Sequence, residues 1–319
     1  MFDVDNWVSA VNFKVEVWVV VEEVFSLCFC LSFLVVFILV VFSGTFFYAY
    51  LSGGDSKVLS LFSGDGVGVL QIEGAIDDSR FVLAELRRFR QTSWIKAVVV
   101  RIDSPGGAVA PTQEIFEEIQ RTKKKKPCIA SMGSVAASGG YYIASACDKI
   151  LANPGTMTGS IGVIMQLSNF EELMKKIGVK GVNIKSGANK DIGSPFQPLS
   201  PEGRDILQSL VDNVHNQFVS AVAKGRGMDE ARVRKLADGR IYSGAQAKEL
   251  GLVDQFGTLE DAIDLAATRV GLEAEPPVYY SRPERERFWD RLFMGVFGVR
   301  LPVSERGWLR YEWSLSLLQ

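Results

Sequence analysis

The sequence predicts an α/β protein built on parallel strands and preceded by one N-terminal transmembrane helix. Two observations lead to this fold class. Short apolar segments typical of strands alternate with amphipathic segments typical of helices, a pattern that favours parallel pairing. Ahead of them, residues 24–54 contain no charged side chain, and about 20 apolar residues suffice for a helix to cross a bilayer.

The apolar run has a second interpretation, a cleaved signal peptide, which requires a basic start and small residues at a cleavage site. Here the leader, residues 1–24, is acidic with Lys14 as its single base, and bulky aromatic residues follow the run. We therefore expect an uncleaved anchor over residues 25–51 that holds the chain in membrane lipid. The flanking charges Lys14 and Lys57 nearly balance, so they do not set its orientation.

The rest of the chain alternates strands and helices before it becomes mainly helical. The expected strands are residues 67–72, 97–102 and 128–132, and the helices that alternate with them are 81–90, 111–121 and 140–147. A helical section follows at residues 201–224, 229–237, 244–250 and 259–270.

Composition excludes several classes of protein. A net charge of −2 over 319 residues gives no reason to expect a nucleic-acid partner. The four cysteines form no disulfide framework, so buried free thiols are expected, with a Cys128–Cys147 pairing left open. The sequence has neither a His/Cys cluster nor a phosphate-binding loop, and we expect no metal and no cofactor.

The residues most suited to chemistry lie in a run of small side chains, residues 133–140, between an apolar strand and an apolar helix. Ser138 stands near its end, and a helix that begins at about Gly139 directs its first free N–H groups toward the serine oxygen. A hydroxyl beside free amides is half of a nucleophile and oxyanion-hole arrangement.

The other half, a general base, is restricted by composition. The single histidine, His215, lies in a long amphipathic helix pattern that favours an ordinary helix-surface residue. A lysine is the remaining candidate, and it must be neutral to accept a proton, a state that burial promotes. Residues 184–195 contain Lys185 and Lys190 after a strand-like stretch, and spacing alone does not choose between them.

A second glycine-containing turn, Pro105 to Gly107, follows the buried strand 97–102. Loops at the carboxyl ends of parallel strands lie at one edge of the sheet, so this turn and the run around Ser138 can face one another. Its glycines allow a backbone N–H to be exposed without a side chain in the way. The simpler interpretation of an isolated Pro-Gly-Gly is a tight turn.

Five groups of residues closely resemble the short, single-domain signal peptide peptidases of the SppA type, peptidase family S49. The resemblance covers about residues 66–272 and rests on Arg101–Gly107, Ser131–Tyr142, Thr158–Val163, Ile184–Pro195, and residues 225–228 with 238–240. It implies a crotonase/ClpP-like spiral of ββα units, which we expect over a peptidase domain at 58–275. The amphipathic tail, 276–319, carries none of it.

The resemblance also implies a role for each residue that matches a motif position. Ser138 fills the nucleophile of Ala-Ser-Gly-Gly, and Lys190 fills the general base that stands immediately before Asp-Ile. Ser160, in Thr-Gly-Ser, corresponds to the serine that orients the lysine. The N–H groups of Gly107 and Gly139 correspond to the oxyanion hole.

Partners and location follow from the same resemblance. It implies a serine endopeptidase of the cell membrane, single-pass, with its catalytic domain outside the cytoplasm. Its substrates are signal peptide remnants and other apolar peptides. It also implies a homo-oligomer in which the serine and lysine of one active site come from neighbouring subunits.

Two alternatives remain at this point, a crotonase-fold acyl-CoA enzyme and a non-catalytic membrane scaffold. For residues 284–319 three interpretations remain: a membrane-surface segment, a subunit contact and a mobile tail.

Overall fold

The computed structural model describes residues 32, 34–43, 64–281 and 310–312. The chain divides into two compact units, Met1–Ser63 and Gly64–Gln319. In the first unit, residues 34–43 are helical and their apolar side chains are exposed. None of the helices within the described ranges has the length and apolar character that crossing a bilayer requires. The other residues of the predicted anchor, 25–51, lie outside the described residues.

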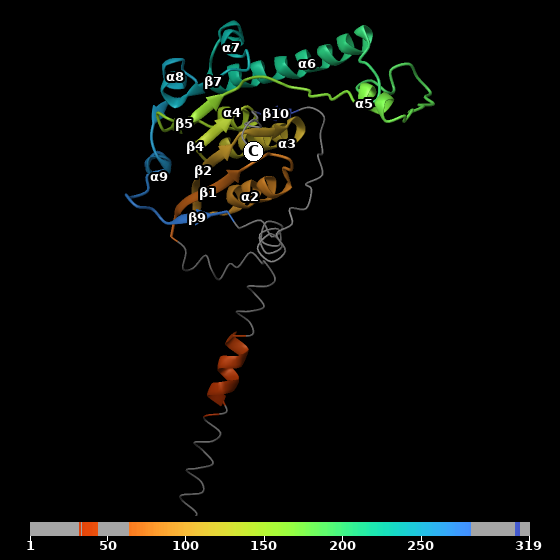
Figure 1. Ribbon diagram of the computed structural model, residues 1–319. Helices are drawn as coiled ribbons and strands as arrows, with labels where there is room; N and C mark the ends of the chain where they lie inside the picture. The colour runs from red at the N-terminus through yellow and green to blue at the C-terminus, as the bar shows by residue number, and fades with distance from the viewer. Residues whose placement is uncertain (1–31, 33, 44–63, 282–309, 313–319) are drawn as a thin grey trace, which may run out of the picture. The chain divides into compact units, whose positions relative to one another are not determined.

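The second unit is built around an eight-stranded sheet (Figure 1), which confirms the predicted α/β class. Its main path is β7-β6-β4-β2-β1-β9, with β5 beside β4 and β8 beside β5. All pairs are parallel except β6 with β7. The strands are β1 (Gly66–Glu73), β2 (Ile95–Ser104), β4 (Cys128–Ala137), β5 (Lys149–Ala152), β6 (Met157–Gly159), β7 (Ile241–Ser243), β8 (Gln255–Phe256) and β9 (Val278–Tyr280).

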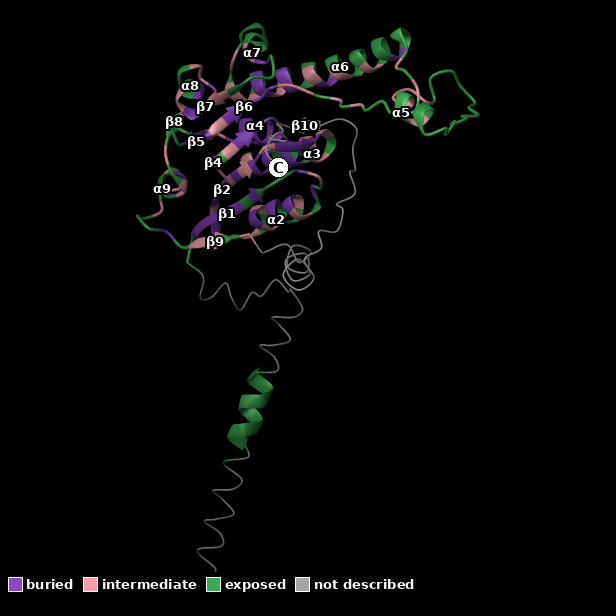
Figure 2. Ribbon diagram, in the orientation of Figure 1, coloured by how far each residue is buried: buried purple, intermediate pink, exposed green. Residues whose placement is uncertain are grey.

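Helices cover both faces of this sheet because its central strands are apolar on both sides. In β2, Val98 and Val100 belong to one core, and Ala97 and Val99 belong to the other. The larger core lies under α2, α3, α4 and α6, and the smaller lies under α9; Figure 2 shows the sheet as largely buried. The helices are α2 (Arg80–Gln91), α3 (Val109–Lys123), α4 (Gly139–Ser145), α5 (Glu171–Lys176), α6 (Pro201–Arg226), α7 (Glu230–Leu236), α8 (Gly244–Glu249) and α9 (Leu259–Arg269).

Short extended segments leave the sheet between a strand and its helix. After β2, the segment β3 (Gly106–Ala108) precedes α3, and after β1 the residue Ile76 precedes α2. These two segments pair with each other: the Ile76 N–H donates to the Gly106 carbonyl, and the Ala108 N–H donates to the Ile76 carbonyl, both at 2.9 Å. Twice, therefore, a strand is followed by a short extended segment and then by a helix.

Strand β4 bends in its middle and reaches further than the predicted 128–132. Its register with β2 shifts beyond Ile102, and the Val135 N–H instead donates to Asp103 Oδ1 at 3.0 Å. Gly133 is required at the bend, because a Cβ there would lie 2.7 Å from the Asp103 side chain. The first part of β4 pairs with β5 and the last part with β6. The bend therefore places the end of β4 beside β6.

Residues 163–213, which we call the arm, extend away from the sheet and include α5 and the first half of α6 (Figure 1). The predicted strand-like stretch before Lys185 is wrong: residues 179–184 are irregular and exposed. Figure 2 shows that most of α5 and of the first half of α6 is exposed, whereas all but one of the buried residues of α6 lie in its second half.

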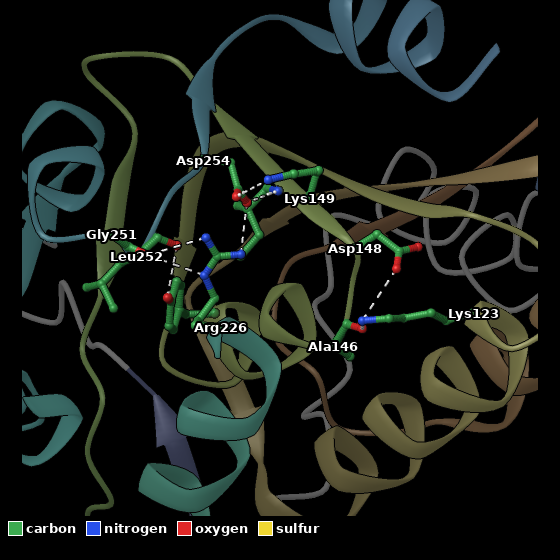
Figure 3. Close-up of polar contacts among 10 residues, drawn as sticks. Lys123, Ala146, Asp148, Lys149, Arg226, Gly251, Leu252 and Asp254 are labelled. Atoms are coloured by element: carbon green, nitrogen blue, oxygen red, sulfur yellow. Dashed lines mark hydrogen bonds and ion pairs between the residues drawn. The ribbon is translucent and has the colours of Figure 1, made fainter. Parts of the chain in front are cut away.

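A polar network fixes the buried end of α6 to the sheet (Figure 3). Arg226 donates to Asp254 Oδ2 at 2.8 Å and to the Gly251 carbonyl at 3.3 Å, and Lys149 pairs with Asp254 Oδ1 at 2.9 Å. The preceding Gly225 allows close contact with α4, since a Cβ there would lie 2.0 Å from the Ser145 carbonyl oxygen. The base of the arm is thereby held in a fixed position.

Candidate active site

Ser138 lies on the sharp turn between β4 and α4. Its φ is 53°, in the left-handed region that few residues with side chains adopt. The Ser138 N–H donates to the Gly159 carbonyl at 2.8 Å, and the Ser138 carbonyl accepts from the Tyr142 N–H at 2.8 Å. Ser138 is 1% exposed, and within the described residues its Oγ has no hydrogen-bond partner. A buried hydroxyl without a partner costs stability, so it indicates a functional role.

Helix α4 begins at Gly139 as predicted, but its N–H groups do not bond to the Ser138 hydroxyl. The expectation that they point at the serine oxygen is therefore wrong in this detail. Because no hydroxyl uses them, these amides remain available to an oxygen atom that lies beside Ser138.

Ser160 is the structural neighbour of Ser138. Strands β4 and β6 are parallel and in register up to Ala137 and Gly159, so Ser138 and Ser160 each stand one residue past the paired ends. Neighbouring strands are about 4.8 Å apart. Ser160 also has a left-handed φ, 49°, and its N–H donates to the Arg240 carbonyl at 2.8 Å. The structure thus places two predicted site residues side by side.

The amides of Gly107 and Gly139 also lie close together. A Cβ on Gly139 would lie 3.3 Å from the Gly107 nitrogen, and a Cβ on Gly107 would lie 2.4 Å from the Ile76 carbonyl oxygen. Ile76 bonds to Gly106 and Ala108, and successive peptide groups of a strand point to opposite sides. The N–H of Gly107 therefore points away from Ile76.

A strand from the end of the chain pairs at this position. Backbone residues Arg310–Glu312 form β10, which is antiparallel to β3, with Tyr311 opposite Gly107. The sequence left residues 284–319 open between three interpretations, and nothing in their spacing indicated a strand. The same holds for β9, which follows Pro276 and Pro277 and pairs with β1 at the edge of the sheet.

The two candidate lysines differ in their contacts. The Lys185 ammonium bonds to Asp191 Oδ1 at 2.6 Å and to the Ala188 carbonyl at 2.9 Å, and this hydrogen bond lowers the pKa of the Asp191 carboxyl. Lys190 is exposed, and its ammonium has no partner in the described part of the chain. Asp191 therefore turns toward Lys185 and leaves Lys190 available.

Ser138 and Lys190 do not meet within one chain. The Lys190 loop packs on the start of α6, where a Cβ on Gly203 would lie 3.7 Å from the Ile192 side chain. The Ser138 turn packs near Phe218, whose ring centroid is 4.8 Å from that of Tyr142. At 1.5 Å per residue, Gly203 and Phe218 are about 22 Å apart along the helix.

His215 is not the featureless surface residue that its helix pattern predicts. It lines a cavity of about 470 Å³ together with Ser160, Asp212 and Asp238. Its Nε2 is buried without a partner among the described residues. The hydrogen bond from Arg240 lowers the pKa of the Asp238 carboxyl, so this residue lines the cavity as a carboxylate that is paired with Arg240. Local spacing contains no signal for this proximity, because His215 and Ser160 belong to separate elements.

Other reactive side chains of the described residues are unsuited to nucleophilic chemistry. Cys128 and Cys147 are free and buried, as expected, and burial raises the pKa of the Cys128 thiol to about 12. The thiolate needed for reactivity is therefore absent near neutral pH. No three potential metal ligands come together within the ranges that the structure describes.

A serine on a strained strand-to-helix turn, with two backbone amides close by, is an arrangement typical of serine hydrolases. Comparison with known proteins identifies the family of the chain. The sequence profile of peptidase family S49 matches residues 120–273. A Synechocystis protein named "Putative protease" is 47% identical over 208 residues, which cover 65% of this chain and 75% of the relative.

Two further relatives found by sequence are also named as proteases or peptidases, and one solved structure is similar in fold. A second "Putative protease", from Methanocaldococcus jannaschii, is 33% identical over 76% of each chain. A protein of Enterococcus faecium named as a signal peptide peptidase, SppA, is 45% identical over 57% of this chain and 53% of the relative. A ClpP1 mutant structure from Listeria monocytogenes aligns at 18% identity and a TM-score of 0.43, over 61% of this chain and 94% of that chain.

The chain belongs to peptidase family S49, and it is a serine peptidase of the SppA type. The acyl-CoA enzyme and the non-catalytic scaffold are thereby set aside.

Proposed function

We propose that this serine peptidase is a membrane-anchored endopeptidase that degrades cleaved signal peptides and other apolar peptides through a Ser138/Lys190 dyad. The observation that carries the proposal is the state of Ser138. Its hydroxyl is buried and unpartnered within the described residues, its backbone is left-handed, and it stands beside Ser160 and the amide of Gly139. Such a hydroxyl is placed to react and not to stabilise the fold.

The roles follow from this arrangement. Neutral Lys190 accepts the Ser138 proton while the serine oxygen attacks the scissile carbonyl carbon, and it then protonates the leaving amine. The N–H groups of Gly107 and Gly139 hold the oxyanion. Ser160 hydrogen-bonds the lysine and orients it. A water molecule, activated by the same lysine, then hydrolyses the acyl-enzyme and restores the Ser138 hydroxyl.

The base comes from a second copy of the chain in this proposal. The separation of about 22 Å along α6 exceeds the reach of a lysine side chain, so Lys190 of one subunit serves Ser138 of its neighbour. The arm supports such an assembly, because most of the exposed large apolar side chains of the second unit lie on it. They include Ile164, Phe170, Leu173, Ile177, Val179, Val182, Ile184, Phe196, Ile206 and Leu210. Apolar surface of this extent favours burial against a partner.

The proposed substrate class rests on the small residues before Ser138 and on the predicted anchor. Ala136 and Ala137 leave room for an extended apolar peptide to lie along the end of β4. Residues 25–51 hold the domain in the cell membrane as a single span, where signal peptide remnants are released. We place the catalytic domain outside the cytoplasm. We expect several copies of the ClpP-like domain to assemble into a closed oligomer.

The decisive experiment mixes two inactive variants before assembly. Ser138→Ala and Lys190→Ala proteins are each expected to lose cleavage of an apolar reporter peptide. When they are mixed as unfolded or dissociated chains and assembled together, some sites combine an intact serine with an intact lysine, and activity returns. Assembling each variant alone is the control. Full activity of the Lys190→Ala protein would exclude the Ser138/Lys190 dyad. A complete lack of rescue would show that the two residues of one active site come from the same chain.

A further inference from the structure

Basic side chains gather at the end of the sheet where β1, β2 and β4 begin. Helices α2 and α3 end there, and a short loop leads from α3 into β4. The Lys126 ammonium connects these parts, because it donates to the carbonyl of Phe89 and, at 2.6 Å, to that of Thr92. We call this group of side chains the basic end; its members are Arg87, Lys96, Arg121 and residues 123–126.

One buried carboxylate holds the arginines of α2 and α3 together. Glu118 is 1% exposed, and it pairs with Arg90 of α2 and, at 3.2 Å, with Arg121 of α3. Arg87 lies 4.0 Å from the same carboxylate. Arg87 and Arg121 are each more than half exposed. A single negative charge thus faces three guanidinium groups, and positive charge remains on the surface.

The lysines that follow add to this positive charge. Lys124 and Lys125 are exposed, and within the described residues their ammonium groups have no partner. Lys123 differs, because it pairs with Asp148 at 3.5 Å (Figure 3). Burial lowers the pKa of Lys126 to about 8, and the neighbouring charges of Lys96 and Lys125 lower that pKa as well. These lysines therefore lie close enough to repel one another, and a negatively charged partner would relieve the repulsion.

The chain enters the domain beside the same group. Asp65, just before β1, pairs with Lys96 at 3.2 Å, and the Gly66 N–H donates to the Trp94 carbonyl at 2.8 Å. The predicted anchor ends at Leu51, and the residues from there to the domain span at most about 45 Å when fully extended. The basic end is thus within reach of the lipid headgroups that surround the anchor.

We propose that the basic end docks the peptidase domain on a bilayer surface that contains anionic phospholipid. The proposal rests on the membrane anchor of the proposed function, and it adds an electrostatic contact with the same bilayer. One basic residue near an anionic lipid surface strengthens binding by about fivefold, so Lys124 and Lys125 together contribute about 25-fold. The anchor keeps lipid at a high local concentration, so contacts of this strength are sufficient to hold the domain on the surface.

Docking at this end keeps the Ser138 turn away from the lipid. Strand β4 begins at Cys128, two residues after Lys126, and ends at Ala137 beside Ser138. Its ten residues give a separation of the order of 30 Å. A peptide can therefore reach the active site without displacing the lipid. We expect charge changes at the basic end to alter docking and to leave peptide cleavage unchanged.

The first measurement is amide hydrogen exchange of the full chain in nanodiscs. One set is made of phosphatidylcholine alone, and the other contains about one third phosphatidylglycerol. Exchange at residues 121–127 should be about threefold slower or more in the anionic discs. Lys124→Glu/Lys125→Glu should remove the difference, and so should about 0.5 M salt, which screens the charges.

The matched control is Lys224→Glu/Lys235→Glu. It makes the same change of charge at two exposed lysines in the last turns of α6 and α7. This variant should behave as wild type in both kinds of disc. Both double variants should also cleave a reporter peptide in detergent at the wild-type rate. Lost cleavage in a folded Lys124→Glu/Lys125→Glu protein would contradict the separation of the basic end from the active site.

Equal exchange in neutral and anionic discs would overturn the proposal, and so would an equal loss of protection in the control variant. Protection by inorganic phosphate in neutral discs would indicate a site for a free anion, which also overturns it. A chain that does not remain with lipid would count against the anchor of the proposed function. In that case the full chain is sedimented with vesicles of the same two compositions. Preferential binding to the anionic vesicles would still support the basic end, and equal binding would overturn it.

Discussion

Ser138 and Ser160 leave two parallel strands at the same level, and both residues have left-handed backbones, with φ of 53° and 49°. The Ser138 N–H donates to the carbonyl of Gly159, so the turn that carries one serine is bonded to the turn that carries the other. Left-handed conformations of residues with side chains cost of the order of 1–3 kcal/mol each. Two such residues on neighbouring turns indicate that the fold accepts backbone strain to hold both serines at the same end of the sheet.

The first prediction separates the two lysines. Lys190→Ala should lower kcat for an apolar peptide by about 100-fold or more, because the general base is lost. Lys185→Ala removes the partner of Asp191 and loosens the loop, so a loss of less than about tenfold is expected. Wild-type activity should rise from neutral to alkaline pH as a lysine base loses its proton. A larger loss in Lys185→Ala than in Lys190→Ala, or activity that falls toward alkaline pH, would contradict the assignment.

Gly139→Ala tests the oxyanion site. The new methyl group would lie 2.9 Å from Thr112 Oγ1 and 3.3 Å from the Gly107 nitrogen, so it separates the two amides. We expect kcat to fall by about 100-fold, the usual effect of losing one oxyanion donor. Gly155→Ala is the control, since a Cβ at Gly155 meets nothing within 4 Å. Circular dichroism of both variants shows whether the fold is kept. Wild-type kcat in a folded Gly139→Ala protein would exclude this role for its amide.

Much of the fold could be predicted from periodicity, and much of the site could not. The runs at 97–102 and 128–132 are apolar on both faces, and both are strands of the sheet. The continuation of β4 to Ala137 was missed, because Gly133 and Ser134 interrupt the apolar pattern and Asp103 replaces the lost strand partner. The place of Ile76 beside Gly107 depends on a pairing between distant segments, which local spacing does not record.

The arm supplies a prediction about assembly. Ile184 is 100% exposed and stands close to Lys190 in the sequence, so burial against a neighbouring subunit is the expected fate of its side chain. Ile184→Glu should reduce the oligomer and the peptidase activity together, measured by sedimentation and peptide cleavage. Lys180→Glu introduces the same residue at another exposed arm position without loss of apolar surface, and a smaller effect is expected. Full activity in a monomeric Ile184→Glu protein would contradict subunit sharing.

The last prediction concerns the network that holds α6 (Figure 3). Burial alone raises the pKa of the Asp254 carboxyl, but hydrogen bonds from Arg226 and Lys149 outweigh it, and the pKa is lowered. Arg226→Met should reduce the free energy of unfolding at pH 7 by about 2 kcal/mol, because it leaves a partly buried carboxylate with fewer donors. Lys149→Met removes the more exposed partner, so about 0.5 kcal/mol is expected.

The pH dependence of this difference has a fixed sign. A carboxyl whose pKa is lower in the folded protein contributes stability that is fully present above its unfolded pKa, near 3.9. That contribution is lost as the pH falls through the folded value, because protonated Asp254 no longer attracts Arg226. Denaturant unfolding of wild type and Arg226→Met should therefore differ most above about pH 5 and converge in acid. A gap that stays the same in acid would show that Arg226 acts through packing and not through its charge.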